Sequence, residues 1–437
     1  MGKPHKKYEE LTNLEIKYIK DKLSITKIKD LDTVLFKRLK EKLKELKDVR
    51  NKNMISYKIW DVVMCVIIAS LADNDTWEEI HEFVLENYKW FKSFLQMTGG
   101  VPKAASYERI MGLIDSEQLN SILLEFFNAV TLSTYSEDEL VCIDGRVNRG
   151  SKRKKTIMND DKKPLNCLNI YSSKDGYCID TITIDDKTNE IPTIKEYFNN
   201  KNLKGKIITV DALNTQRDNV KAVIDANADY VFPVKGNQGD VLSNINDYFT
   251  QDKCDEIIAG NSNSEYETYI EKSHGQVIKY EYFQTSDIKW YDRNNEWAGL
   301  KSIGLVRKTI TSVITVENKK KKANNKKIEK EITTVENRYF ISSLNVDIKK
   351  FSSAIRGHWL IENKIHWHLD YTFKQDKNTT TNKNALLNLE IIHKFALAVL
   401  EKTKKKYKRS LIRIRKHLGR NIEENFLEFA CFLIVSH

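Results

Sequence analysis

The chain has 437 residues, of which 30% are charged and 41% hydrophobic, and this composition suits a soluble globular protein of two or three domains. The formal net charge of +11 favours nucleic acid as a partner over a membrane, although solubility alone explains the same excess of lysine and arginine. The six cysteines are scattered without a C-x-x-C pair, and no apolar run is long enough to span a bilayer. These features predict a cytoplasmic protein that is neither secreted nor inserted in a membrane.

Residues 1–135 are predicted to form an all-helical N-terminal domain. The segment 59–71 is apolar almost all round, which indicates a buried helix. The next predicted helix, 77–88, has Asp75 or Thr76 as its N-cap. Lysine and arginine on several short helices fit a DNA-binding region and a plain helical cap equally well.

Residues 136–250 alternate between predicted strands and helices. The strands are expected at 140–143, 168–172, 177–184, 206–210 and 230–234, with a hairpin turn at 174–176 and helices between the later strands. This order predicts the first part of an α/β core with a mixed sheet. Residues 251–345 alternate as strands do and form a predicted β-rich insertion, with the basic run 319–330 as a hairpin tip. Residues 346–437 are predicted to be helical and to include a basic tail.

A carboxylate falls on the apolar stripe of the helix predicted from 351 to 373. Glu362 shares that stripe with Phe351, Ile355, Trp359, Ile365, Leu369 and Phe373. A carboxylate there would be desolvated unless a cation, a metal or strong donors meet it. Two interpretations therefore stay open, a buried ion pair with Arg356 or Lys364 and a metal-binding carboxylate.

Two further carboxylates, Asp144 and Asp211, stand at the ends of predicted strands. Ligand groups in α/β domains gather at the carboxyl ends of strands, although Asp144-Gly145 is also ordinary turn chemistry. Together with Glu362 they give three hard oxygen ligands, which suit Mg²⁺ or Mn²⁺. Two such ions would activate a nucleophilic oxygen and stabilise a leaving oxygen in phosphodiester chemistry. Zinc is disfavoured, because the spacing of His358, His366 and His368 is wrong for a compact pair.

Basic and aromatic residues near these carboxylates are candidate DNA contacts. The loop after Asp144 carries Arg146, Arg149, Lys152 and Arg153, and Lys235 and Asn237 follow the strand predicted at 230–234. Packing or DNA contact is expected for His358, Trp359, His366 and Trp367. The chain has no phosphate-binding loop of the G-x-x-x-x-G-K-[ST] type, so ATP-driven chemistry is not indicated.

Five blocks of the sequence resemble the DDE transposases of bacterial insertion sequences, specifically the ISAs family. They are IDGRVNRGS (143–151), KTNEIP (187–192), TVDALNTQ (209–216), DYVFPVKGNQ (229–238) and RYFISSL to IRGHWLIENKIHWHLDYTF (338–373). The resemblance implies an RNase H-like catalytic core with a β-rich insertion before the last acidic helix. It also implies that Asp144, Asp211 and Glu362 form the metal-binding triad.

The resemblance places further residues in the signature around the third acid. Arg356, His358, Trp359 and Asn363 flank Glu362 there and join the expected DNA contacts. The chain has Arg146 where the family usually has lysine. It has His358 where related transposases place arginine, although ISAs members commonly share this histidine. Neither departure removes a metal ligand.

The sequence therefore predicts a transposase that cuts double-stranded DNA at insertion-sequence terminal repeats and joins the ends to target DNA. We expect a homodimer in the DNA complex, in the bacterial cytoplasm and associated with the nucleoid. A stand-alone metal-dependent nuclease and a catalytically silent, transposase-derived DNA-binding protein are the alternatives. A helical scaffold that binds no nucleic acid is the third, and it would show no salt-dependent DNA binding.

Overall fold

The computed structural model describes residues 13–23, 31–131, 139–152, 163–173, 177–184, 190–199, 202–260, 263–273, 275–317 and 327–435. The predicted turn at 174–176 and most of the basic run 319–330 lie outside these residues. The chain divides into two compact units. The first unit combines Met1–Ser136, Gly145–Lys187 and Ile361–His437, and the second combines Glu137–Asp144 and Thr188–Leu360.

The N-terminal part of the first unit is helical, as predicted. Its helices are α1 (Asn13–Leu23), α2 (Leu31–Leu43), α3 (Ile59–Leu71), α4 (Trp77–Glu86), α5 (Tyr88–Lys92), α6 (Ala104–Met111) and α7 (Ser116–Thr131). Every residue of α3 except Trp60 is buried, which confirms the predicted buried helix. Thr76 caps α4 in a capping box with Glu79, so the chain enters this helix in a fixed direction.

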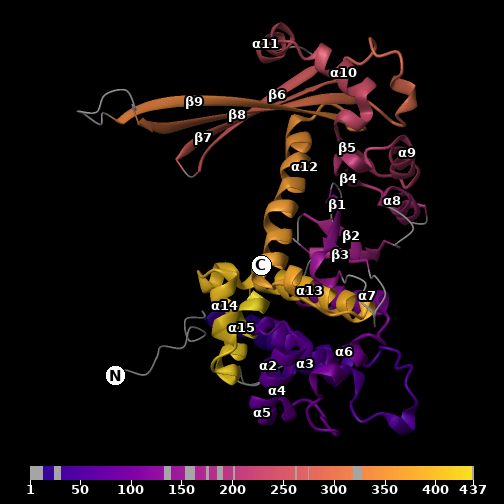
Figure 1. The fold of residues 1–437 in the computed structure, drawn as a ribbon, viewed down its shortest axis with the longest axis vertical. Coiled ribbons are helices and arrows are strands. Elements are labelled where there is room, and N and C mark those ends of the chain that lie inside the picture. The colour runs from indigo at the N-terminus through magenta and orange to yellow at the C-terminus, as the bar shows by residue number, and fades with distance from the viewer. Residues whose placement is uncertain are drawn as a thin grey trace. The chain divides into compact units, whose positions relative to one another are not determined.

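The rest of the first unit comes from the middle and the end of the chain. It contains the antiparallel strands β2 (Leu165–Ser172) and β3 (Tyr177–Thr183), and the helices α13 (Lys383–Tyr407), α14 (Leu411–Leu418) and α15 (Ile422–Val435). The long helix α13 packs against α3, α6, α7 and β3 (Figure 1). The core of this unit therefore forms between segments from opposite ends of the sequence.

The second unit is built on a mixed sheet, which confirms the predicted α/β class. Its strand order is β1-β4-β5-β9-β8-β7-β6. The strands are β1 (Glu139–Asn148), β4 (Lys206–Val210), β5 (Asp229–Val234), β6 (Ser264–Ser273), β7 (Gln276–Thr285), β8 (Ser302–Glu317) and β9 (Lys327–Ser342). β1, β4 and β5 are parallel, whereas β9, β8, β7 and β6 are antiparallel. The boundary between the units falls inside β1, after Asp144. The strands of the first unit, β2 and β3, continue the strand order as β3-β2-β1.

The strands of the predicted insertion continue this sheet. Val231 on β5 pairs with Ser342 on β9, so β9 extends the core sheet at its edge. The 16-residue strands β8 and β9 run beyond the other strands (Figure 1). The predicted ranges 1–135, 136–250, 251–345 and 346–437 stay predictions as domain boundaries.

Five helices complete the second unit, and one of them leads directly to Glu362. They are α8 (Glu190–Phe198), α9 (Arg217–Asp225), α10 (Gly239–Tyr248), α11 (Gln251–Ala259) and α12 (Ile348–Leu360). α12 packs on β4, β5, β6 and β7. A Cβ on Gly304 of β8 would come within 2.2 Å of the Phe351 ring, so the glycine makes room for α12 against the sheet. Among the described residues, no helix is both long and apolar enough to cross a membrane.

The helix predicted from 351 to 373 is interrupted. α12 ends at Leu360 and is followed by the π-helical segments Ile361–His366 and His368–Thr372. The buried face of α12 follows Phe351, Ile355 and His358, so His358 is buried and Trp359 is only half-buried, contrary to the predicted stripe.

Candidate active site

Asp144 and Asp211 follow register-paired positions on two neighbouring parallel strands. The last residue pair of β1 and β4 is Ile143 with Val210, and each aspartate comes next in its strand direction. Both flanking residues are fully buried, whereas the aspartates are partly exposed. Because paired strands lie about 4.8 Å apart, the two carboxylates leave neighbouring positions at the same edge of the sheet.

A short turn fixes the carboxylate of Asp211. This residue caps the 3₁₀ turn Ala212–Asn214, and its Oδ1 accepts hydrogen bonds from the Asn214 backbone nitrogen (3.0 Å) and from Asn214 Nδ2 (2.8 Å). Asn214 is fully buried, so its amide cannot move away without disturbing the turn. One oxygen of Asp211 is thus oriented by two donors.

The same amide of Asn214 brings Glu190 into this cluster. Asn214 Nδ2 also donates to Glu190 Oε2 at 2.9 Å, so the two carboxylates share one amide donor. Burial raises the pKa of Glu190; the hydrogen bond from Asn214 opposes the rise, and the negative charge of Asp211 adds to it. Sequence reasoning gave Glu190 no role. Its presence in the block KTNEIP was the available signal.

A row of buried polar groups lies one strand repeat before the aspartates. Thr209 Oγ1 on β4 is 3.0 Å from His358 Nδ1 on α12, and the buried residue Cys142 on β1 is the register partner of Thr209. Burial lowers the pKa of His358 to about 4, so the imidazole is neutral at pH 7. His358 is buried, as the packing alternative expected. Its predicted DNA contact stays untested.

Glu362 lies in the π-helical segment Ile361–His366, in the first unit. π-helical turns are rare in proteins, and those that do occur are often found at functional sites. The side chains of Glu362 and Asn363 are outside the described part of the structure. The described side chains contain no group of three or more His, Cys, Asp or Glu that could hold a metal ion. The triad of Asp144, Asp211 and Glu362 stays a prediction.

Arg146, two residues after Asp144, has a different environment from the one predicted. Its guanidinium is buried, bonds Asp370 and Gln375, and lies 3.5 Å from Glu390 on α13. All four residues belong to the first unit. The side chain therefore ties the end of β1 to helical segments, and its predicted DNA contact stays a prediction.

Other predicted DNA contacts lie at the surface. Arg149 and Lys152 are exposed in the turn after β1, and Arg153 lies outside the described residues. Lys235 and Asn237 are exposed after β5. Asn237 Nδ2 donates to the carbonyl of Ala212 at 2.9 Å, which ties this turn to the turn of Asp211.

The α12 residues near the predicted third acid have partners on the insertion strands. Arg356 donates to Ser352 Oγ at 3.1 Å and lies 3.9 Å from Glu267 of β6. Trp359 has Arg338 of β9 over its ring at 5.1 Å. These contacts fix α12 on the sheet, and a DNA contact by Arg356 or Trp359 stays a prediction.

Two aromatic candidates follow Glu362 in the first unit. His366 is half-buried with its ring 5.9 Å from that of Tyr171. Trp367 is 48% exposed and stacks on Tyr371 at 4.7 Å. Of these two side chains, only that of Trp367 presents a large aromatic surface to solvent.

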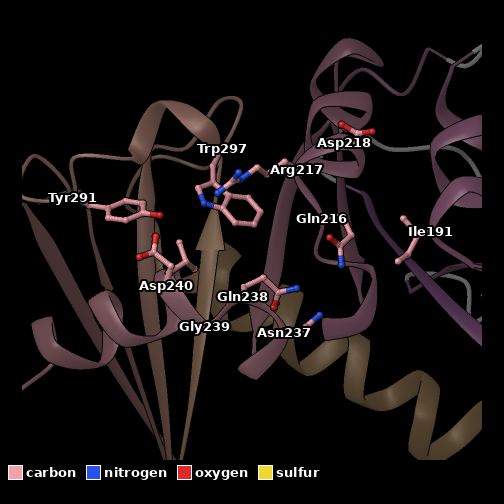
Figure 2. A pocket seen from close by; sticks show the side chains of 11 residues that line it. Ile191, Gln216, Arg217, Asp218, Asn237, Gln238, Gly239, Asp240, Tyr291 and Trp297 are labelled. Carbon is pink, nitrogen blue, oxygen red and sulfur yellow. The ribbon is translucent and has the colours of Figure 1, made fainter.

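A polar pocket of about 450 Å³ adjoins the Asp211 turn in the second unit (Figure 2). Its walls include Gln216, Arg217, Asn237 and Trp297. Arg217 lies over the Trp297 ring at 5.9 Å and is ion-paired with Glu296. The candidate metal ligands are not part of its lining, so the pocket is a neighbour of the candidate site.

Comparison with known proteins decides the family. Residues 135–399, more than half of the chain, match the family model described as Transposase DDE domain. The chain belongs to the DDE transposase family. Residues 40–127 match the DDE_Tnp_1-associated model, which coincides with the helices of the N-terminal part. The predicted membership of the DDE transposases is confirmed, and the family implies dependence on a divalent metal in general.

Relatives of this DDE transposase agree with the assignment. It is 29% identical to "Putative transposase YncI" of Escherichia coli O157:H7, over 82% of this chain and 85% of the relative. It is 28% identical to "H repeat-associated putative transposase YhhI" of Escherichia coli (strain K12), over 84% of this chain and 91% of the relative. The piggyBac transposase synaptic complex with hairpin DNA matches with a TM-score of 0.32 and 11% identity, over 94% of this chain and 80% of that one.

Proposed function

We propose that this DDE transposase cleaves DNA at the ends of an insertion sequence and joins those ends to target DNA. The observation that supports the proposal is the placement of Asp144 and Asp211 after paired positions of β1 and β4. Glu362 completes the acid set that the family resemblance implies. A mixed sheet with three parallel strands, in which Asp144 lies on β1 and Asp211 directly follows β4, agrees with an RNase H-like core.

The chemistry of the donor set fits a hard divalent cation. Asp144, Asp211 and Glu362 offer only carboxylate oxygens, which suit Mg²⁺ or Mn²⁺. Asn214 holds one oxygen of Asp211 in place, so less ordering is needed when a cation binds. Bound there, a pair of such ions would lower the pKa of a nucleophilic hydroxyl and stabilise the charge on the leaving oxygen. The residues of the chain would hold the scissile phosphate and the ions together.

DNA would be held by exposed cations of each unit. Arg149 and Lys152 follow β1, and Lys235 follows β5. Such side chains bind backbone phosphates and make affinity dependent on salt. Double-stranded terminal repeats and target DNA are the proposed partners, with two ends held by a homodimer in the bacterial cytoplasm.

The test is metal-dependent cleavage and joining of DNA that carries the element's own ends. Wild type is compared with Asp144→Asn, Asp211→Asn and Glu362→Gln. Glu423→Gln, at an exposed position in the first turn of α15, serves as the matched control. Products should form with Mg²⁺ or Mn²⁺ in wild type and the control, and disappear in the three variants while DNA binding persists.

The alternatives give different results in the same assay. Cleavage without joining would identify a stand-alone nuclease. DNA binding without any products, with wild type and variants alike, would identify a catalytically silent descendant. Products that survive Glu362→Gln would show that Glu362 is not a metal ligand.

A further inference from the structure

One buried hydrogen bond joins α12 to β4, the strand that Asp211 directly follows. His358 Nδ1 lies 3.0 Å from Thr209 Oγ1, and the two residues are 8% and 2% exposed. Both belong to the second unit, so this geometry lies within one compact body. Cys142 on β1 is the register partner of the same threonine, so the pair lies beside the strand that carries Asp144.

The position of this bond relates it to the proposed acids. Thr209 precedes Asp211 by two residues and Cys142 precedes Asp144 by two, and residues two apart on a strand share a face of the sheet. His358 precedes Glu362 by four residues, which is about one helical turn along the chain. The bond therefore joins a residue close in sequence to Asp211 with a residue close in sequence to Glu362.

The imidazole is suited to positioning rather than to binding phosphate. It is buried and neutral, because burial lowers the pKa of His358 to about 4, so it cannot act as a surface cation. Hydrogen bonds are directional, and a buried one fixes distance and rotation in a way that apolar packing does not. Further along α12, Phe351 packs into the space above Gly304, so the helix is held at two separate points.

We propose that His358 and Thr209 form a positioning pair that fixes the carboxyl end of α12 on β4 and so sets the geometry in which the acids bind metal. His358 is then a positioning residue, which acts through Thr209 and the helix and touches neither DNA nor metal. This inference rests on the proposed function, because it assumes that Asp211 and Glu362 are ligands of the same metal site.

Paired substitutions test the hydrogen bond separately from its surroundings. Thr209→Val removes the hydroxyl and keeps the shape, whereas Thr209→Ser keeps the hydroxyl. His358→Leu removes the ring nitrogen, whereas His358→Asn retains a polar atom near the position of Nδ1. Ser302→Ala is the structural control, because it breaks the buried bond from Gln284 (2.9 Å) in the insertion part of the same unit.

Two readouts are taken on the full-length protein. Binding of Mn²⁺ alone is followed by the electron paramagnetic resonance signal of the free ion, and single-turnover DNA cleavage is followed against Mn²⁺ concentration. We expect Thr209→Val and His358→Leu to raise the half-saturating Mn²⁺ concentration about tenfold, with DNA affinity within twofold of wild type. Thr209→Ser, His358→Asn and Ser302→Ala should stay near the wild-type value.

Three results would overturn the inference. The first is an unchanged Mn²⁺ response in a folded Thr209→Val protein. The second is an equal loss in Ser302→Ala, which would indicate general destabilisation. The third is a loss of DNA affinity in His358→Leu that accounts for its whole defect. If wild type itself neither binds Mn²⁺ nor cleaves, the proposed function fails and the positioning pair fails with it. If wild type does both, only the pair is in question.

Discussion

Replacing Asn214 by leucine should weaken catalysis without weakening DNA binding. The side chain supplies one of the two hydrogen bonds described at Asp211 Oδ1, and it also donates to Glu190. Leucine has nearly the same shape but no donor, so Asp211 would keep only the bond from the backbone nitrogen. A hydrogen bond to a charged group contributes about 1.5–3 kcal/mol. If that contribution is felt in the transition state, cleavage slows by about 10- to 150-fold.

The assay is single-turnover cleavage of a terminal-repeat substrate at saturating protein, alongside equilibrium DNA binding. Asn388→Leu is the matched control, because Asn388 is also fully buried and donates two hydrogen bonds, to the carbonyls of Met111 (2.8 Å) and Ile114 (3.0 Å). Both variants should lose similar stability, and only Asn214→Leu should lose the rate. A rate within twofold of wild type for Asn214→Leu, or an equal loss in Asn388→Leu, would refute the reasoning.

The remaining predictions concern stability and DNA affinity. Arg415 is fully buried and donates a hydrogen bond to Asp75 at 2.5 Å, so Arg415→Met should lower the free energy of unfolding by about 3–5 kcal/mol. The control is Arg413→Met at an exposed position of the same helix, which should change the free energy of unfolding by less than about 0.5 kcal/mol. Denaturant titrations measure both. Burial raises the pKa of Asp75 to about 6, although Arg415 opposes the rise. The folded state therefore binds the Asp75 proton more tightly than the unfolded state does. The stability that this proton contributes is lost as the pH rises from about 4 to 6. In denaturant titrations across that pH range, the free energy of unfolding of Asp75→Asn should increase relative to that of wild type as the pH rises. A difference that stays constant with pH would contradict the assignment. The double variant Arg149→Gln, Lys152→Gln should weaken DNA binding and reduce the slope of log affinity against log salt by about 2, and an unchanged slope would show that neither residue binds phosphate.

The parts of the fold that local patterns determine were predictable from the sequence. The apolar helix at 59–71 and the cap at Thr76 depend on neighbouring residues, and the structure has both. The strand predicted to end before Asp211 also ends there, whereas β1 continues through Asp144 to Asn148. The joining of the insertion to the core sheet was not predictable, because β5 pairs with β9 although β6, β7 and β8 come between them in the sequence. Periodicity also could not show the π-helical turn after Leu360, which contains Glu362.

The candidate site was predictable in its residue types but not in its supporting contacts. A basic residue beside an aspartate looks the same in sequence whether it faces solvent or a buried acid. Arg146 is buried because Asp370 and Glu390, which come from a distant part of the sequence, lie beside it. The role of Asn214 likewise depends on Glu190 reaching the same amide, and nothing periodic in the sequence marks that meeting.

The discontinuous first unit has a consequence for synthesis on the ribosome. Helix α3 is buried almost all round and ends at Leu71, whereas α13, which covers part of it, begins only at Lys383. At about 5–20 residues per second, roughly 15–60 s pass before that partner emerges. The residues between them include the whole second unit, which can form its sheet while the apolar helix still lacks its partner. Nascent chains that end before α13 should therefore contain a folded second unit and an incomplete first unit with exposed apolar surface. Chaperones or proteases would meet the protein in that form.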